Sequence, residues 1–401
     1  MSTFLALSLL WDWRESLVIQ RCAAECKPIP LPQKPTLYPH DVSIIVTTVN
    51  TPDSFTEALR TWLAAKPKEI ILVTVERDEP RLRELLAPVQ YESAAVPITV
   101  LLAPQVNRRE QMGIAFDAAS GKILANVDDC VFWKQPADIL PHMLAPFEDE
   151  EICGVVGRQG AYIAPERRKR GIVTAAEVAA LKYMDANQKL QAARFAADGG
   201  CWTLEGRTCL YRKDALQKAN FRHALTNDMW MGKPLNTGDD SFITRFMITH
   251  GFKMAVQDAP EAEIFKVVMR DTSLYAKQTI RWQRTSLQTC TSLVLLDPGF
   301  WALRRQYPYL ARKYTECSLR LPIAVAHMIA LTLAAQRNPL VACLFILYHA
   351  YGTLKDYSAF VAKYPWASGQ IWFPVVLDYL GCIVHAYCWS TIGRDEWLTR
   401  N

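Results

Sequence analysis

The apolar and polar positions of residues 41–129 follow two alternating patterns. Four short apolar runs, typical of buried strands, lie at 42–46, 70–75, 98–102 and 123–127. The segments between them have helical spacing, and Phe55, Leu59 and Leu63 recur there at i, i+4 and i+8. Strands that alternate with helices predict an α/β fold with a mostly parallel sheet and helices on both faces.

Residues 130–300 continue the same domain with a less regular pattern. Short strands are predicted around 154–157 and 208–211, and helices at 174–190 and 241–249. The basic segment 165–170 has the composition of a solvated connection. We therefore expect one large domain over residues 41–300.

The C-terminal part of the chain is more apolar. Apolar stretches lie at 321–335, 340–354 and 371–393, and the third includes Asp378 and His385. The first two are shorter than the roughly 20 residues that cross a bilayer squarely, so each alone could be a buried core helix. Three in succession predict interfacial and transmembrane helices over 301–401. Residues 1–40 are expected to form a membrane-associated segment, with an interfacial helix at 1–20.

Charged and aromatic residues just before these stretches predict an orientation. Basic residues beside a membrane segment favour its cytosolic side, and aromatic rings favour the headgroup layer. This segment interleaves Arg304, Arg305, Arg312, Lys313 and Arg320 with Trp301, Tyr307 and Tyr309. We therefore expect residues 41–300 to lie on the cytosolic side of the plasma membrane or of a Golgi or ER membrane.

The overall composition excludes some classes of partner. The formal net charge of +5 comes from 45 Lys and Arg against 40 Asp and Glu, too small an excess to predict nucleic-acid binding. The 11 Cys residues show no zinc-type spacing, so we expect reduced thiols that face the cytosol.

Polar residues follow three of the predicted strands, at 47–50, 76–78 and 128–129. In open parallel sheets, ligands bind beyond the carboxyl ends of the strands, so the three clusters predict a nucleotide pocket. Solvated loops would explain the first two clusters equally well. They explain Asp128 and Asp129 less well, because adjacent acids repel each other unless a cation is near.

Asp128 and Asp129 are the first candidate site. A departing nucleoside diphosphate is an anion, and Mg²⁺ or Mn²⁺ held by one or two carboxylates and the phosphates offsets its charge. An acid pair alone is weak evidence, because a solvated strand end is the commoner reason for one.

The triplet Gly238-Asp239-Asp240 is the second candidate, at the start of a predicted helix. A carboxylate held there can act as a general base toward an acceptor hydroxyl. Helix capping by Asp is the simpler explanation, but it accounts for only one of the two acids.

The third candidate is Gln278, Arg281 and Trp282, which project from one face of a predicted helix. Arg can bind a pyrophosphate through two parallel hydrogen bonds, Gln adds a neutral donor, and Trp offers a flat surface to a sugar ring. An amphipathic helix that packs its Trp into the core would show the same spacing.

Together, the order and spacing of these residues resemble a known family. The chain is similar to the processive members of glycosyltransferase family 2, which include hyaluronan, chitin and cellulose synthases, and most closely to the fungal-type polysaccharide synthases. The resemblance covers roughly residues 41–290 and rests on Val42 to Val46, Asp128-Asp129 followed by Val131-Phe132-Trp133, Gly206-Arg207-Thr208, Gly238-Asp239-Asp240, and Gln278 with Arg281 and Trp282.

The resemblance implies a GT-A nucleotide-sugar fold and a role for each motif. Asp128 and Asp129 would hold the metal and the donor, Asp240, beside Asp239, would act as base, and Gln278 and Arg281 would close over the diphosphate. Trp282 would support the acceptor sugar, with Gly206 and Arg207 near the donor or acceptor. The family usually has an Asp after the second strand to bind the nucleobase, and here either Glu76 or Asp78 could replace it. The Asp-x-Asp motif is also irregular, because Asn126 and Cys130 flank the acid pair.

Three functions are compatible with these residues. The first is a membrane-bound inverting enzyme that builds a cell-surface or cell-wall polysaccharide from a UDP-sugar with Mg²⁺ or Mn²⁺. The second transfers one sugar to a membrane lipid, as ceramide glucosyltransferases do, and the third is a non-catalytic relative that assists a synthase. The partners expected are a UDP-sugar, a glycan or lipid acceptor and a lipid bilayer, and a homo-oligomer is compatible with so small a membrane bundle.

Overall fold

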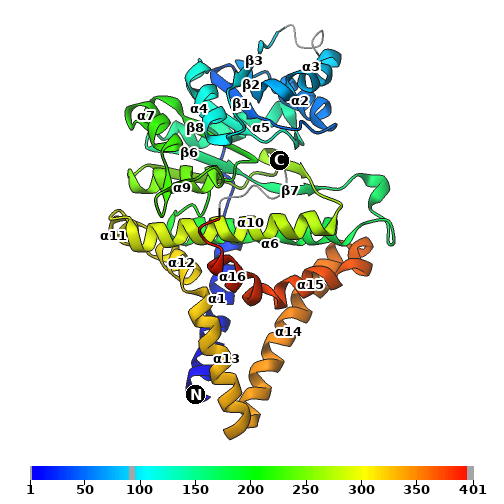
Figure 1. Cartoon of the computed structure of the whole chain (residues 1–401), viewed down its shortest axis with the longest axis vertical. Coiled ribbons are helices and arrows are strands. Elements are labelled where there is room, and N and C mark those ends of the chain that lie inside the picture. Colours follow the sequence, from blue (N-terminus) through cyan, green and yellow to red (C-terminus); the bar gives the residue numbers. More distant parts are fainter. Residues whose placement is uncertain (1, 90–94, 395–401) are drawn as a thin grey trace.

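The computed structural model describes residues 2–89 and 95–394, and its centre is a seven-stranded sheet of order β11-β6-β8-β4-β1-β2-β3 (Figure 1). The strands of this sheet are β1 (Val42–Thr47), β2 (Glu69–Val75), β3 (Ile98–Ala103), β4 (Ile123–Val127), β6 (Ile152–Gly157), β8 (Thr208–Arg212) and β11 (Lys253–Gln257). β1 pairs in parallel with β2 and β4, and β2 with β3. The predicted strands and the α/β class are therefore confirmed.

Helices cover both faces of the sheet, as the sequence predicts. On one face, α2 (Phe55–Ala64) and α5 (Pro136–Leu144) bury Phe55, Trp62 and Ile139 against the sheet. On the other, α4 (Arg108–Ala118) and α9 (Asp239–Thr249) contribute to a second buried cluster. The shorter helices of the domain are α3 (Glu79–Leu86), α7 (Lys213–Lys218) and α8 (Phe221–Thr226).

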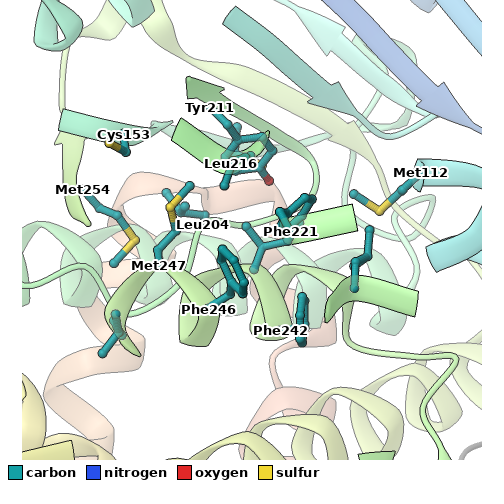
Figure 2. Close-up of a cluster of buried hydrophobic side chains, with 14 of the residues drawn as sticks. Met112, Cys153, Leu204, Tyr211, Leu216, Phe221, Phe242, Phe246, Met247 and Met254 are labelled. Atoms are coloured by element: carbon teal, nitrogen blue, oxygen red, sulfur yellow. The ribbon is translucent and has the colours of Figure 1, made fainter. Parts of the chain in front are cut away.

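The second cluster anchors α9, whose first turn contains Asp239 and Asp240. Phe242, Phe246 and Met247 of α9 point into this cluster (Figure 2). The rings of Phe246 and Phe221 meet edge to face with 5.2 Å between centroids, a favourable arrangement. The start of α9 is thus held by its own buried face.

The strand β8 runs antiparallel between β4 and β6. Its register pairs Asn126 with Cys209, and the amide of Asp128 donates to the Arg207 carbonyl at 3.1 Å. This pairing places Arg207 beside the acids that follow β4, although the two segments are far apart in the sequence.

Two small sheets lie beside the main one. One joins β5 (Val131–Trp133), β12 (Ile264–Val267) and β7 (Gln159–Tyr162), and the other is the hairpin β9 (Met229–Trp230) with β10 (Lys233–Pro234). In the first, Lys266 pairs with Val131, which brings its side chain to the acids after β4.

Two long helices, α6 (Ala175–Asp198) and α10 (Thr272–Thr291), run side by side beneath the sheet and are called the platform here (Figure 1). Thr174 caps α6 by accepting from the Glu177 amide, while Glu177 bonds back to the Thr174 amide. This capping box fixes the start of the helix that the sequence predicts at Thr174.

Three further helices project from the platform away from the sheet and form the arm: α1 (Ser2–Glu25), α13 (Arg320–Arg337) and α14 (Pro339–Lys363) (Figure 1). Leu5, Ala330, Ala334, Ala342 and Phe345 form the buried interior of the arm. Two short helices, α11 (Phe300–Gln306) and α12 (Pro308–Ser318), connect α10 to it.

The third predicted apolar stretch, 371–393, is not one helix. It divides into α15 (Trp372–Tyr379) and α16 (Gly381–Ser390). The turn between them brings the end of α16 back to α10, where Gln288 donates to the Ile392 carbonyl at 2.7 Å and Arg284 to Thr391 Oγ1 at 3.0 Å.

The length and apolar composition of the described helices bear on membrane spanning. None alone is long and apolar enough to cross a membrane. The consecutive helices α12 and α13 meet this criterion as a pair, and they join at an angle of 67°.

Candidate active site

A cavity of about 330 Å³ lies between the sheet and the platform. All three motifs line it: Asp128 and Asp129 after β4, Gly238 to Asp240 at the start of α9, and Gln278, Arg281 and Trp282 on α10. Gly206 and Arg207 line it as well. The fold therefore gathers four separate segments, between residues 128 and 282, around one space.

Asp128 is surrounded by positive charge. One carboxylate oxygen accepts from Arg108 Nη2 at 2.6 Å and the other from Lys266 Nζ at 3.3 Å. Burial opposes ionisation of this carboxyl, but the nearby charges of Arg108 and Lys266 outweigh it and hold its pKa well below the ordinary value. Its neighbour Asp129 is also buried and accepts from Thr48 Oγ1 at 2.7 Å.

The Gly-Asp-Asp triplet depends on a special backbone conformation. Gly238 has a φ of +69°, and a Cβ there would lie 2.3 Å from the Thr285 methyl group on α10. Glycine is therefore required by conformation and by the close approach of α10. The turn directs Asp239 and Asp240 into the cavity.

Asp239 and Asp240 have different surroundings. Asp239 accepts from Arg108 Nε at 3.0 Å, so a single guanidinium links the two acidic motifs. Asp240 accepts a hydrogen bond from the Ser241 amide at 2.7 Å. Burial, and next the charge of Asp239, raise the pKa of Asp240 to about 6.

Arg108 and Lys266 are site residues that the sequence analysis missed. Arg108 opens α4, directly after the capping residue Asn107, and Lys266 lies on β12. A basic residue at a helix start after a strand carries no specific signal. Only the ion pairs to Asp128 and Asp239 reveal its place.

A second buried Arg supports the loop before the triplet. Arg109 donates to the Thr237 carbonyl at 2.9 Å and to Asp228 at 2.9 Å. Because its side chain is almost fully buried, these bonds fix the loop that ends at Gly238.

The face of Trp282, predicted to support the acceptor sugar, is partly covered by a neighbouring ring. Trp282 stacks on Tyr183 of α6, with ring centroids 5.2 Å apart and an angle of 21° between planes. The Arg207 guanidinium lies 5.7 Å from the Trp282 ring and is bonded to Glu205 and Gln159. Gln278 is buried one turn before Trp282, so this face of α10 is directed into the cavity.

The two candidates for nucleobase binding lie at the end of β2, as predicted, but not at the cavity. Glu76 is exposed, whereas Asp78 is buried and accepts from the Asn50 amide at 3.2 Å. Neither is among the described residues that line the cavity. The structure brings Asp78 to the end of β1 and leaves Glu76 at the surface.

Among the described residues, no group of three or more His, Cys, Asp or Glu side chains is arranged to hold a metal ion. Mg²⁺ and Mn²⁺ sites of nucleotide enzymes commonly use one or two carboxylates and complete the coordination with substrate phosphates. Asp128 and Asp129 lie adjacent at one strand end and could supply these carboxylates, with the Asp128 oxygens now bonded to Arg108 and Lys266.

Comparisons with known proteins point to one family. The family model described as glycosyltransferase-like family 2 matches residues 39–285. The NDP-glycosyltransferase ltbB of Aspergillus luteorubrus is 37% identical over 98% of this chain and 97% of its own length. A type 2 glycosyltransferase of Zymoseptoria tritici is 33% identical over 74% of this chain and 60% of its own length.

A solved structure has the same fold. The mannosyltransferase PcManGT of Pyrobaculum calidifontis, in complex with GDP-mannose and Mn²⁺, superposes with a TM-score of 0.57 at 18% identity, over 95% of this chain and 99% of that one. This likeness confirms the GT-A fold.

Proposed function

This chain belongs to glycosyltransferase family 2, and from that premise we propose that it transfers one sugar, with inversion, from a nucleotide-sugar donor to an acceptor hydroxyl. The enzyme class is a glycosyltransferase that depends on a nucleoside diphosphate sugar. The observation that carries the proposal is the meeting of Asp128, Asp240 and Arg281 around one cavity.

The donor diphosphate is proposed to bind between the acids of β4 and α10. Arg108, Lys266 and Arg281 all line the cavity, and together they can offset the charge of a pyrophosphate. Asp128 and Asp129 would hold Mg²⁺ or Mn²⁺, which supplies further positive charge to the leaving diphosphate. For the nucleobase we propose Asp78 rather than Glu76, because Asp78 is buried beside the end of β1, although it does not line the cavity itself.

Asp240 is the proposed general base. With a pKa near 6 it is ionised at neutral pH, yet more basic than an ordinary carboxylate. It can take the proton of an acceptor hydroxyl while that oxygen attacks the anomeric carbon and the nucleoside diphosphate departs. Asp239 is paired with Arg108, and we assign it to position the turn.

The acceptor is proposed to bind beside Trp282 and Tyr183, whose stacked rings offer apolar surface next to Asp240. Arg207, Glu205 and Asn187 provide polar contacts at the same part of the cavity. A glycan or the sugar-like head of a lipid fits this combination of flat rings and hydrogen-bonding groups.

Single transfer is favoured over polysaccharide synthesis by the arm. A processive synthase needs a polar path for its product, whereas the interior of the arm is filled by Leu5, Ala330 and Phe345 together with smaller apolar side chains. The polymer remains the alternative that product sizing tests. A non-catalytic role is disfavoured because a binding module has no need for a carboxylate of raised pKa in its cavity.

The reaction is proposed to take place at a membrane, with residues 41–300 on the cytosolic side, where nucleotide sugars are made. The basic and aromatic residues that precede α13 support this orientation. The division at residues 40 and 300 stays a prediction, as does a homo-oligomer.

The test is release of nucleoside diphosphate by the purified full chain in detergent. UDP-N-acetylglucosamine, UDP-glucose, UDP-glucuronate and GDP-mannose are supplied in turn, with Mn²⁺, with Mg²⁺ or with EDTA, and a hydroxyl acceptor. Release that needs one donor and is lost in Asp240→Asn supports the proposal, and the mass of the product separates one added sugar from a polymer. Nucleotide binding without turnover of any donor would favour the non-catalytic alternative.

A further inference from the structure

We propose that the arm inserts into an anionic lipid surface, with its apolar outer faces in the acyl layer and two basic clusters next to the platform on the headgroups. This inference rests on the membrane location proposed above and adds to it the inserting element, its orientation and the lipid charge.

All three helices of the arm expose large apolar side chains. α1 exposes Leu7, Leu10, Trp13 and Leu17; α13 exposes Ile323, Val325, Met328 and Ile329; α14 exposes Leu340, Leu344, Leu347, Tyr351 and Leu354. Leu347 is 63% exposed and Met328 64%. Soluble surfaces rarely present so many contiguous apolar side chains.

The arrangement of the helices decides which partner can cover these faces. Leu5 of α1, Ala330 and Ala334 of α13, and Phe345 of α14 meet in a common interior. The outer faces of the three helices therefore point in different directions. A protein partner, including a second copy of this chain, covers one side, whereas lipid can cover all of them.

The charged residues of α13 and α14 lie near the ends of these helices, whereas α1 carries Asp12, Arg14 and Glu15 near its middle, of which Glu15 is buried and paired with Arg312 and Lys313. Residues 321–336 and 338–354 contain no Asp, Glu, Lys or Arg, and charged residues resume at Arg320 and Lys355 near the platform. At 1.5 Å per residue, the charge-free part of α13 is about 24 Å long, enough to enter the acyl region deeply. The charged residue at the far end of α13 is Arg337, whose long side chain can extend to a polar layer.

Two basic clusters flank the point where the arm leaves the platform. One is Arg168, Lys169 and Arg170 in the exposed loop between β7 and α6, where the Arg170 side chain lies beside Gly369 in the short helix Pro365–Gln370 that follows α14. The other is on α11, where Arg304 and Arg305 are exposed next to Trp301, itself 62% exposed.

The clusters lie at opposite ends of the platform. Figure 1 shows α11 at one end and the green loop that precedes α6 at the other, with the arm between them. Clustered Lys and Arg next to an inserted segment attract anionic headgroups, and Trp favours the same layer. We therefore expect the headgroup layer to lie at the level of both clusters, with the arm extending beyond it.

This orientation positions the reaction. The cavity lies between the sheet and the platform, and both platform helices contribute to its lining. It is then one helix layer above the headgroups, with the nucleotide side toward the cytosol. An acceptor that resides in the membrane can approach from the platform side.

The experiment is vesicle flotation of the detergent-purified full chain, after detergent removal into phosphatidylcholine vesicles with and without phosphatidylserine. The unmodified chain is expected to float with both kinds of vesicle. At low salt it should bind vesicles with phosphatidylserine about tenfold more strongly than vesicles without it, and high salt should remove this preference. Equal flotation with both compositions would overturn the anionic preference.

Two variants separate insertion of the arm from contact of the basic cluster with headgroups. Leu344→Glu with Leu347→Glu should abolish flotation with both vesicles, because two carboxylates would enter the acyl layer. Arg168→Glu, Lys169→Glu and Arg170→Glu together should retain flotation but lose the preference for phosphatidylserine. The matched control replaces Lys66, Lys122 and Lys218, which are exposed on the sheet domain, with Glu. It should behave like the unmodified chain.

Other results identify other occupants. If the arm variant floats normally, lipid does not cover these faces. If the unmodified chain does not float but forms a dimer, and the arm variant is a monomer, a second copy covers these faces and the proposal is wrong. Donor turnover in detergent is measured for every variant, so that loss of membrane binding with intact turnover is separated from failure of the proposed transfer.

Discussion

The two acidic motifs of the cavity have the same side chains and opposite electrostatics. Asp128, after β4, is held by Arg108 and Lys266, and its pKa is lowered, whereas Asp240, at the start of α9, is buried beside Asp239 and its pKa rises to about 6. Asp128 can therefore stay ionised beside a cation or the donor, whereas Asp240 can accept a proton. Residue type alone does not assign these roles, because the neighbours do so.

The largest expected effect comes from removing the base. Asp240→Asn keeps the size of the side chain and removes its proton affinity, so kcat should fall by about 10² to 10⁴. Nucleoside diphosphate affinity, measured by calorimetry, should change little. Asp240 is not the base if the variant turns over at a normal rate.

Removing Arg108, which links the two acidic motifs, should affect both the stability of the fold and the pH dependence of activity. Arg108→Met leaves Asp128 and Asp239 without their shared guanidinium, and the free energy of unfolding should drop by about 3 kcal/mol, as for other buried ion pairs. Arg108 also lowers the pKa of Asp240, so the acid limb of the activity profile should move to higher pH. Arg222→Met removes an exposed pair to Asp117 and serves as the control for denaturant unfolding. An unshifted profile would show that the two motifs are electrostatically independent.

Arg281 tests the helix that closes the cavity. Arg281→Ala removes a charged donor from α10, and the Kd for UDP or GDP should rise about 30-fold, or ~2 kcal/mol. Arg281→Lys keeps the charge without the planar fork and should recover only part of this loss. Unchanged nucleotide affinity in the alanine variant would remove Arg281 from the donor site.

The pKa of Asp240 predicts the pH dependence. Only the ionised carboxylate can accept a proton, so kcat should be half-maximal near pH 6 and fall about tenfold per unit below that. Activity is gained as the pH rises through this pKa, which burial and Asp239 have raised. A rate independent of pH from about 5 to 8 would contradict this assignment.

The smallest effect is expected from Lys266, which shares Asp128 with Arg108. Lys266→Met should weaken nucleoside diphosphate binding about fivefold, because one of several positive charges is lost. Lys134→Met, which removes a rim pair to Glu263 near the same small sheet, is the matched control. Equal affinities in the two variants would exclude Lys266 from the donor site.

Much of the fold and of the site could be predicted from the sequence. The runs at 42–46, 70–75 and 123–127 are strands because buried parallel strands are continuously apolar, a local property. The three motifs could be located because each is short and contains its own chemistry. Their functional roles remain proposals, but their meeting around one cavity is established.

The tertiary structure decided what depends on partners far apart in the sequence. Arg108 and Lys266 reach Asp128 only because α4 and β12 converge at the end of β4, and no local pattern records such a contact. The break before Gly381, the burial of Asp78 beside an exposed Glu76, and the directions of the arm's apolar faces also follow from packing. Sequence patterns report which residues prefer burial or charge, but the pKa and the role of a carboxylate depend on the charges and the burial that the folded chain places around it.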